Sequence, residues 1–231
     1  MEGAAMKRQG RFRGVAGGGR LWGAWTVSCA AGELLGIAAA AAIATVLNRL
    51  MAEPAGFAAA VLVLPAMALA GAVEGSSIAW FQWRILRCRL PGLAFGPWLL
   101  ATVGVAVLGW TLATGATLAA AVGHADESPA QPPLIVIALV ASGFGLAGGA
   151  VFGAAQWVVL RRQARRAARW IVANGIGWAV AVPCVSVAAA LPSQTTAASA
   201  IVALGAGAGV LAGLAVGAIT GVEVVRLRPA A

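Results

Sequence analysis

The sequence has little charge for its length. Asp, Glu, Lys and Arg make up 10% of its 231 residues, whereas a soluble domain carries roughly 25%. So few charged side chains cannot cover a surface that faces water, which excludes an ordinary soluble fold. Hydrophobic residues make up 61% of the chain, and a lipid bilayer is therefore the expected solvent.

Residues that usually carry catalysis or bind metals are also scarce. The chain has one histidine, His124, and three cysteines, Cys29, Cys88 and Cys184, at spacings that suggest neither a disulfide framework nor a metal site. It has no Ser/His/Asp set, and its G-x-G patterns lie inside apolar runs instead of between a strand and a helix. We therefore expect a protein that is not an enzyme and that has no metal and no cofactor.

Long apolar runs dominate what remains. Each run is longer than the roughly 20 residues that a spanning helix needs, and none alternates in polarity as barrel strands do. Helices are expected because lipid offers no hydrogen-bond partner to an unpaired backbone amide. The sequence thus predicts an all-α membrane protein with six transmembrane helices. The six runs cover about 22–47, 57–81, 98–122, 133–158, 170–191 and 198–224.

Basic residues fall on one side of this arrangement. Fifteen of the sixteen lysines and arginines lie before the first run, between the second and third, between the fourth and fifth, or at and after the end of the sixth. Arg49 is the exception. This positive-inside pattern predicts that both termini are cytoplasmic, and it explains the net charge of +9 without nucleic acid as a partner. The basic N-terminal tail, residues 1–21, could also rest on anionic lipids at the cytoplasmic face.

A motif recurs within the apolar runs. Residues 71–87, GAVEGSSIAWFQWRILR, and residues 145–161, GLAGGAVFGAAQWVVLR, share the pattern G-x3-G-x6-Q-W-x2-L-R. The sixth run carries a weaker copy, with Thr220 where glutamine would stand. Trp25, Trp98 and Trp170 each open an odd-numbered run, 73 and 72 residues apart. The chain therefore reads as one transmembrane domain, residues 22–228, built from three hairpin repeats (22–87, 98–161 and 170–228) in an approximate threefold arrangement.

The doubled Q-W-x2-L-R helix end resembles a motif of uncharacterised bacterial multi-pass membrane proteins. The resemblance covers residues 69–87 and 145–178, and Arg84 stands where that pattern has an apolar residue. It implies a multi-pass protein of the bacterial inner membrane and carries no implied activity.

Two roles are expected for the polar and aromatic residues of the motif. Trp25, Trp83, Trp98, Trp157 and Trp170 lie near the cytoplasmic boundary, where tryptophan commonly anchors a helix at the membrane interface. The polar side chains at the motif's glutamine position share a face with the GxxxG-like glycines, so we expect them to clasp neighbouring helices. The other reading places them around the cytoplasmic mouth of a central cavity. These side chains are Gln82, Gln156 and Thr220.

Glu33 and Glu74 are the ionisable residues well inside the runs. They lie at similar expected depth with no basic residue near, so at least one is expected to be protonated at neutral pH. Buried acids in membranes suggest function, here a proton or cation site; the other reading is a structural carboxyl. The sequence thus favours a non-enzymatic scaffold or accessory subunit that binds a membrane protein or a second copy of itself. The alternative is a small proton- or cation-coupled transporter or channel that uses Glu33 and Glu74.

Overall fold

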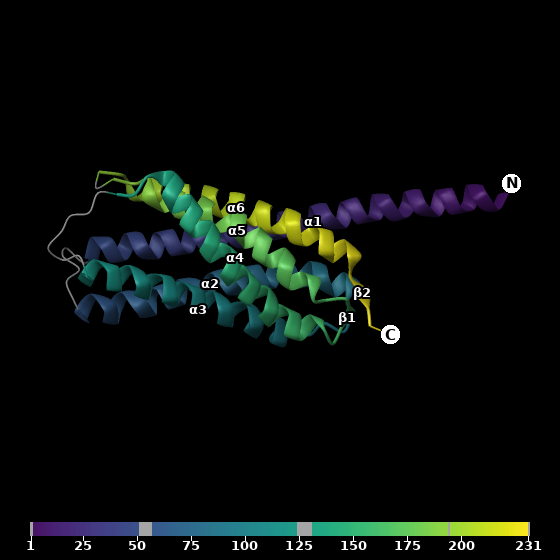
Figure 1. The fold of residues 1–231 in the computed structure, drawn as a ribbon, viewed down its shortest axis with the longest axis horizontal. Helices are drawn as coiled ribbons and strands as arrows, with labels where there is room; N and C mark the ends of the chain where they lie inside the picture. The colour runs from purple at the N-terminus through teal and green to yellow at the C-terminus, as the bar shows by residue number, and fades with distance from the viewer. Residues whose placement is uncertain (1, 51–56, 124–130, 194, 231) are drawn as a thin grey trace.

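The computed structural model contains six long helices joined by short connections (Figure 1). It describes residues 2–50, 57–123, 131–193 and 195–230. All six helices are long and apolar enough to cross a bilayer, which confirms the predicted class of helical membrane protein. The helices are α1 (Glu2–Leu50), α2 (Phe57–Arg89), α3 (Phe95–Gly123), α4 (Leu134–Leu160), α5 (Arg169–Ala190) and α6 (Ala198–Arg226). Helix α1 begins at Glu2 and so continues through most of the basic segment 1–21.

The helices form a closed ring in chain order. Each helix packs against the next one, and α6 returns to pack against α1; the contact between α3 and α4 is the smallest. Because every helix reverses direction, α1, α3 and α5 begin at the end of the bundle where α2, α4 and α6 finish (Figure 1). We call this the basic end, since it holds Arg20, the arginines in the last turns of α2 and α6, those that follow α4, and Arg169. The other end is called the opposite end.

Glycines set the close spacing of several helix pairs. A Cβ atom on Gly213 of α6 would come within 2.5 Å of the Ala30 Cα on α1. A Cβ on Gly75 of α2 would come within 2.7 Å of the Val103 Cα on α3. Lipid does not drive helices together as water does, so close backbone contact is a main source of their association. The glycine-rich faces are therefore the surfaces on which the bundle is assembled.

Large apolar side chains cover the outside of the bundle. Leu35, Leu69, Leu100, Phe144 and Val172 are each more than half exposed. Such a surface would be unstable in water and is the natural contact with acyl chains.

A two-stranded ribbon closes the basic end. Strand β1 (Ala164–Arg165) lies in the connection between α4 and α5 and pairs antiparallel with β2 (Arg228–Pro229), which follows α6. The amide of Ala230 also donates to the carbonyl of Gln163 (2.9 Å). The ribbon ties the α4–α5 connection to the C-terminal residues.

Candidate functional site

Helices α1 and α2 bring the two membrane acids together. Glu33 is 2% exposed and Glu74 is 5% exposed. The helices approach closely here because Gly36 lies opposite Glu74: a Cβ on Gly36 would come within 2.6 Å of the Glu74 Cγ. This contact places both acidic side chains in the interface between the same two helices.

The acid pair is enclosed by side chains and backbone from four helices. The indole Nε1 of Trp110 on α3 donates a hydrogen bond to Oε2 of Glu74. The hydroxyl of Ser77 lies 2.8 Å from both the Gly32 and the Glu74 carbonyl oxygens. Helix α6 covers the other side, since a Cβ on Gly209 would come within 2.5 Å of the carbonyl oxygen of Glu33.

One acceptor of this pair has no partner. Among the described residues, Oε2 of Glu33 is buried without a hydrogen bond, and no lysine or arginine forms an ion pair with either carboxyl. Two carboxyl groups that share a site without a cation can hold one proton in a hydrogen bond between them. Chemically, the pair can therefore share one proton.

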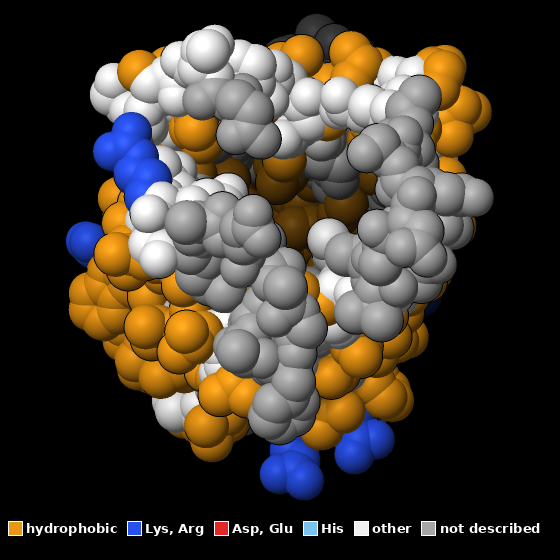
Figure 2. Space-filling model, turned by 90° about the vertical axis from the view of Figure 1, so that its left-hand side faces the viewer, with side chains coloured by type: hydrophobic (Ala, Val, Ile, Leu, Met, Phe, Trp, Pro, Cys, Tyr) orange, Lys and Arg blue, Asp and Glu red, His pale blue; other side chains and the backbone are white. Residues whose placement is uncertain are grey.

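Access to the acids is the property that separates a transport site from a structural one. Figure 2, which looks onto the opposite end, shows that end hollowed at its centre, with hydrophobic side chains on the visible walls. No acidic side chain of a described residue is visible in the hollow. The burial of Glu33 and Glu74 places these two acids in contacts between helices.

A second polar cluster lies nearer the basic end and is centred on three tryptophans. Trp25, Trp98 and Trp170, one from each odd-numbered helix, are at most 1% exposed. The ring centroids of Trp25 and Trp170 are 5.6 Å apart and those of Trp98 and Trp170 are 6.3 Å apart, both edge to face. This geometry is favourable for aromatic pairs. The three rings fill the centre of the bundle at this level.

Hydrogen bonds connect these tryptophans to the motif's polar side chains. Trp170 Nε1 donates to Oε1 of Gln156 (2.8 Å), and Trp25 Nε1 donates to the hydroxyl of Thr220 (2.8 Å). The amide nitrogen of Gln156 donates to Oε1 of Gln82 (3.1 Å) and to the hydroxyl of Thr102 (3.0 Å). The amide of Gln82 in turn lies 3.8 Å from the sulfur of Cys29. Side chains from all six helices take part.

The structure corrects the role expected for three of the five tryptophan anchors. Trp25, Trp98 and Trp170 lie inside the protein and do not reach the lipid-facing surface, because their large rings fill the centre of the bundle. Trp83 and Trp157 are half-buried, and Arg87 and Arg161 stack on them at 4.7 and 5.0 Å from the ring centroids. These two pairs have the arrangement of an interface anchor.

Several residues of the site were not singled out in the sequence. Trp110 could have been found as a tryptophan in the middle of an apolar run, where its N–H needs an acceptor. Thr102 and Asn174 are buried polar residues one turn after Trp98 and Trp170. The indole nitrogen of Trp178 is also buried, and it has no hydrogen-bond partner among the described residues. The position of Trp178 in the sequence gives no indication of this burial.

Glu223 lies outside both clusters. Glu223 pairs with Arg226 at 2.8 Å near the basic end. His124, Asp126 and Glu127 fall outside the described residues. Within the part of the chain that the structure describes, no group of three His, Cys, Asp or Glu side chains could hold a metal ion.

No family model, curated protein or solved structure matches the chain. The fold itself defines a multi-pass helical membrane protein. What the protein does is therefore inferred from its own residues.

Proposed function

We propose that the protein is a non-enzymatic scaffold or accessory subunit of the bacterial inner membrane. The observation that carries this proposal is the closure of its polar sites: Glu33, Glu74 and the glutamines are occupied by contacts between helices. A transport site needs groups that alternate between two aqueous sides. Groups that are enclosed by packing instead fix one arrangement of helices.

The proposed orientation puts the basic end and both termini in the cytoplasm. Arg84, Arg87 and the arginines between α4 and α5 lie at this end, as the positive-inside rule requires. Cys88 offers a native probe because it is exposed at the same end, whereas Cys29 is buried. An impermeant maleimide should label Cys88 in inverted vesicles and spare it in right-side-out vesicles.

The threefold hairpin repeat remains part of the proposal, and the tryptophan contacts support it. Trp170 donates to the polar residue at the end of the preceding hairpin, Gln156, and Trp25 donates to that of the last hairpin, Thr220. The third equivalent pair would join Trp98 to Gln82. Instead, Trp98 Nε1 has no hydrogen-bond partner among the described residues, and Gln82 accepts from Gln156.

A proton- or cation-coupled transporter is the second candidate, favoured by one observation. Oε2 of Glu33 is buried without a partner beside a second carboxyl, and such a group in a membrane is a recognised functional signal. The resemblance to uncharacterised bacterial membrane proteins does not separate the two functions.

Reconstituted vesicles distinguish the candidates. The scaffold proposal expects proton and potassium fluxes no higher than in vesicles without protein, both for the native chain and for the double variant Glu33→Gln/Glu74→Gln. Flux in the native protein that the double variant abolishes would establish the transporter and refute the scaffold.

A complementary test uses cells that lack the protein. If it acts by assembly, Glu33→Gln/Glu74→Gln should restore the native phenotype, because an amide pair can still hydrogen-bond across α1 and α2. Gly213→Leu, which separates α1 from α6, should not restore it. If the glutamine double variant fails to restore the phenotype and Gly213→Leu restores it, the carboxyl groups themselves are required.

A further inference from the structure

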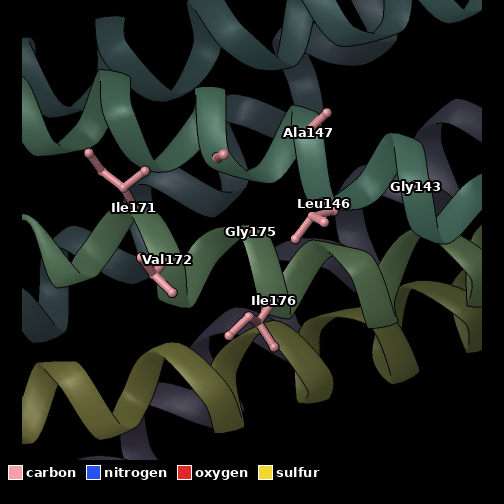
Figure 3. Close-up of a pocket in the computed structure, with 8 residues that line it drawn as sticks. Gly143, Leu146, Ala147, Ile171, Val172, Gly175 and Ile176 are labelled. Atoms are coloured by element: carbon pink, nitrogen blue, oxygen red, sulfur yellow. The ribbon is translucent and has the colours of Figure 1, made fainter.

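Helices α4 and α5 leave an apolar groove on the outside of the bundle. Its volume is about 370 Å³. Figure 3 shows Leu146 and Ala147 on α4 and Ile171, Val172 and Ile176 on α5 around it. The lining is completed by Gly143, Ala150 and Gly175. Small residues on both helices leave space between the larger side chains that line the groove.

The face of each helix that lines the groove leads to an arginine at the basic end. On α4, residues 143, 147, 150, 154, 157 and 161 follow one another at steps of four and three, so Arg161 lies on the same face as Gly143 and Ala150. On α5, residues 169, 172 and 176 do the same, so Arg169 lies below Val172 and Ile176. The two stripes that line the groove thus both finish in a guanidinium group.

These two arginines are available to a ligand. Both are exposed, and among the described residues neither side chain makes a hydrogen bond or an ion pair. Arg161 is stacked on Trp157, which holds its guanidinium near the membrane interface. The connection between α4 and α5 also contains Arg162, Arg165 and Arg166 and no acidic residue. An anion at this point would meet several unpaired donors.

The length of the groove decides between a lipid chain and a partner helix. Residues 143–150 of α4 cover roughly 10 Å at 1.5 Å per residue, about a third of the 30 Å hydrocarbon core. A spanning helix would need a groove along the whole core. One leaflet accounts for about half of that core, roughly 15 Å, so the groove covers about two thirds of the length of one acyl chain.

We propose that the α4–α5 groove with Arg161 and Arg169 is a binding site for one anionic phospholipid. One acyl chain lies in the groove, and the phosphate accepts hydrogen bonds from the two guanidinium groups, for which phosphate is a well-matched acceptor. The site needs only that the bundle spans a membrane, so it holds whether or not the protein is a scaffold.

Native mass spectrometry of the delipidated protein tests the head-group contact. Phosphatidylglycerol is expected to bind about tenfold more tightly than phosphatidylcholine with the same chains. The double variant Arg161→Gln/Arg169→Gln should reduce phosphatidylglycerol binding to the phosphatidylcholine level. The control Arg84→Gln/Arg87→Gln removes the same charge at the end of α2, where Arg87 also stacks on a tryptophan, and should keep the preference. Equal binding of the two lipids, or equal loss in both variants, would overturn the proposal.

A second pair of variants tests the groove. A Cβ on Gly143 meets nothing within 4 Å, so Gly143→Leu fills the groove without disturbing the fold and should displace the lipid. Gly109→Leu on α3, where a Cβ is equally free, should leave lipid binding unchanged. Three results would show that the groove does not hold an acyl chain. Lipid binding could be unchanged in Gly143→Leu, or soluble glycerol phosphate could displace the lipid fully. The third result is that Gly143→Leu removes a dimer of the protein from the mass spectrum and not a bound lipid.

Discussion

The two ends of the bundle are built differently. At the basic end, three tryptophans, two glutamines and a two-stranded ribbon fill and close the centre, whereas the opposite end is hollowed (Figure 2). Over the described residues, the buried position nearest the opposite end is Ala106 on α3, Ala181 on α5 and Ala208 on α6. On α3, α5 and α6 the buried side chains are therefore concentrated toward the basic end, whereas on α1, α2 and α4 they extend to Thr45, Met67 and Ala141.

This difference has a physical cause in residue size. Near the basic end, indole rings and amide groups meet across the bundle axis and satisfy one another's hydrogen bonds. Toward the opposite end, the chain supplies mainly Ala, Val, Leu, Gly and Thr. Smaller side chains fill less of the space between six helices, and Figure 2 shows a hollow at this end.

Trp170→Ala should have the largest effect. Removing the ring creates a cavity at the centre and leaves Oε1 of Gln156 without its donor. A large-to-small change of this kind lowers the free energy of unfolding by about 3–5 kcal/mol. Trp80→Ala, which removes a half-exposed ring, should cost much less. Thermal or denaturant unfolding in detergent measures both, and equal losses would show that the tryptophan cluster does not hold the bundle together.

Gly213→Leu should come next. Its side chain would press on the backbone of Ala30, and overpacking of this kind costs about 1–3 kcal/mol. Gly207→Leu on the same helix, where a Cβ meets nothing within 4 Å, is the matched control and should be nearly neutral. The same unfolding assay compares them. Similar stability of the two variants would contradict the close α1–α6 contact.

Glu74→Leu should have a smaller but measurable effect. It leaves the N–H of Trp110 without its acceptor, which costs about 1–3 kcal/mol. Glu74→Gln keeps an oxygen for that N–H and should lose less than half as much. The order of unfolding midpoints checks this expectation; a glutamine variant as unstable as the leucine variant would mean that the charge itself is needed.

Trp98→Phe should have the smallest effect. The Trp98 N–H is buried and has no hydrogen-bond partner among the described residues. Removing this donor is favourable and offsets part of the packing energy lost with the ring, so little net change in stability is expected. Trp170→Phe, by contrast, breaks the hydrogen bond to Gln156 and should cost about 1 kcal/mol more. If Trp98→Phe were the worse variant, Trp98 would have a hydrogen-bond partner in solution, and the three tryptophans would be more alike than they are here.

Sequence reasoning was most successful where one residue type has one physical consequence. Apolar length predicted six spanning helices, and the structure confirms them. Glu33 and Glu74 were expected at similar depth in neighbouring runs, and both are buried on the neighbouring helices α1 and α2. These features depend on local spacing, which the sequence contains directly.

Tryptophan was the residue type for which sequence reasoning failed. A tryptophan near a membrane boundary suits both the lipid interface and the protein interior, and position along a helix does not show which way a ring points. Trp83 and Trp157 have arginines one turn later, whereas Trp25, Trp98 and Trp170 are followed by Cys29, Thr102 and Asn174. Such small or polar residues one turn on are the signal that could have marked the buried set. The α4–α5 groove depends on how two helices cross, which no spacing in the sequence specifies.

The closure of the acid pair is tested most directly by a membrane-permeant carbodiimide, which reacts with protonated carboxyl groups that it can reach. Leu35→Glu provides a reactive control, because Leu35 is on the same helix two residues from Glu33 and is 52% exposed. Peptide mass spectrometry of treated vesicles should find an adduct on the introduced glutamate and none on Glu33 or Glu74. An adduct on either native acid would show that the pair is open to lipid or water and would contradict a structural role.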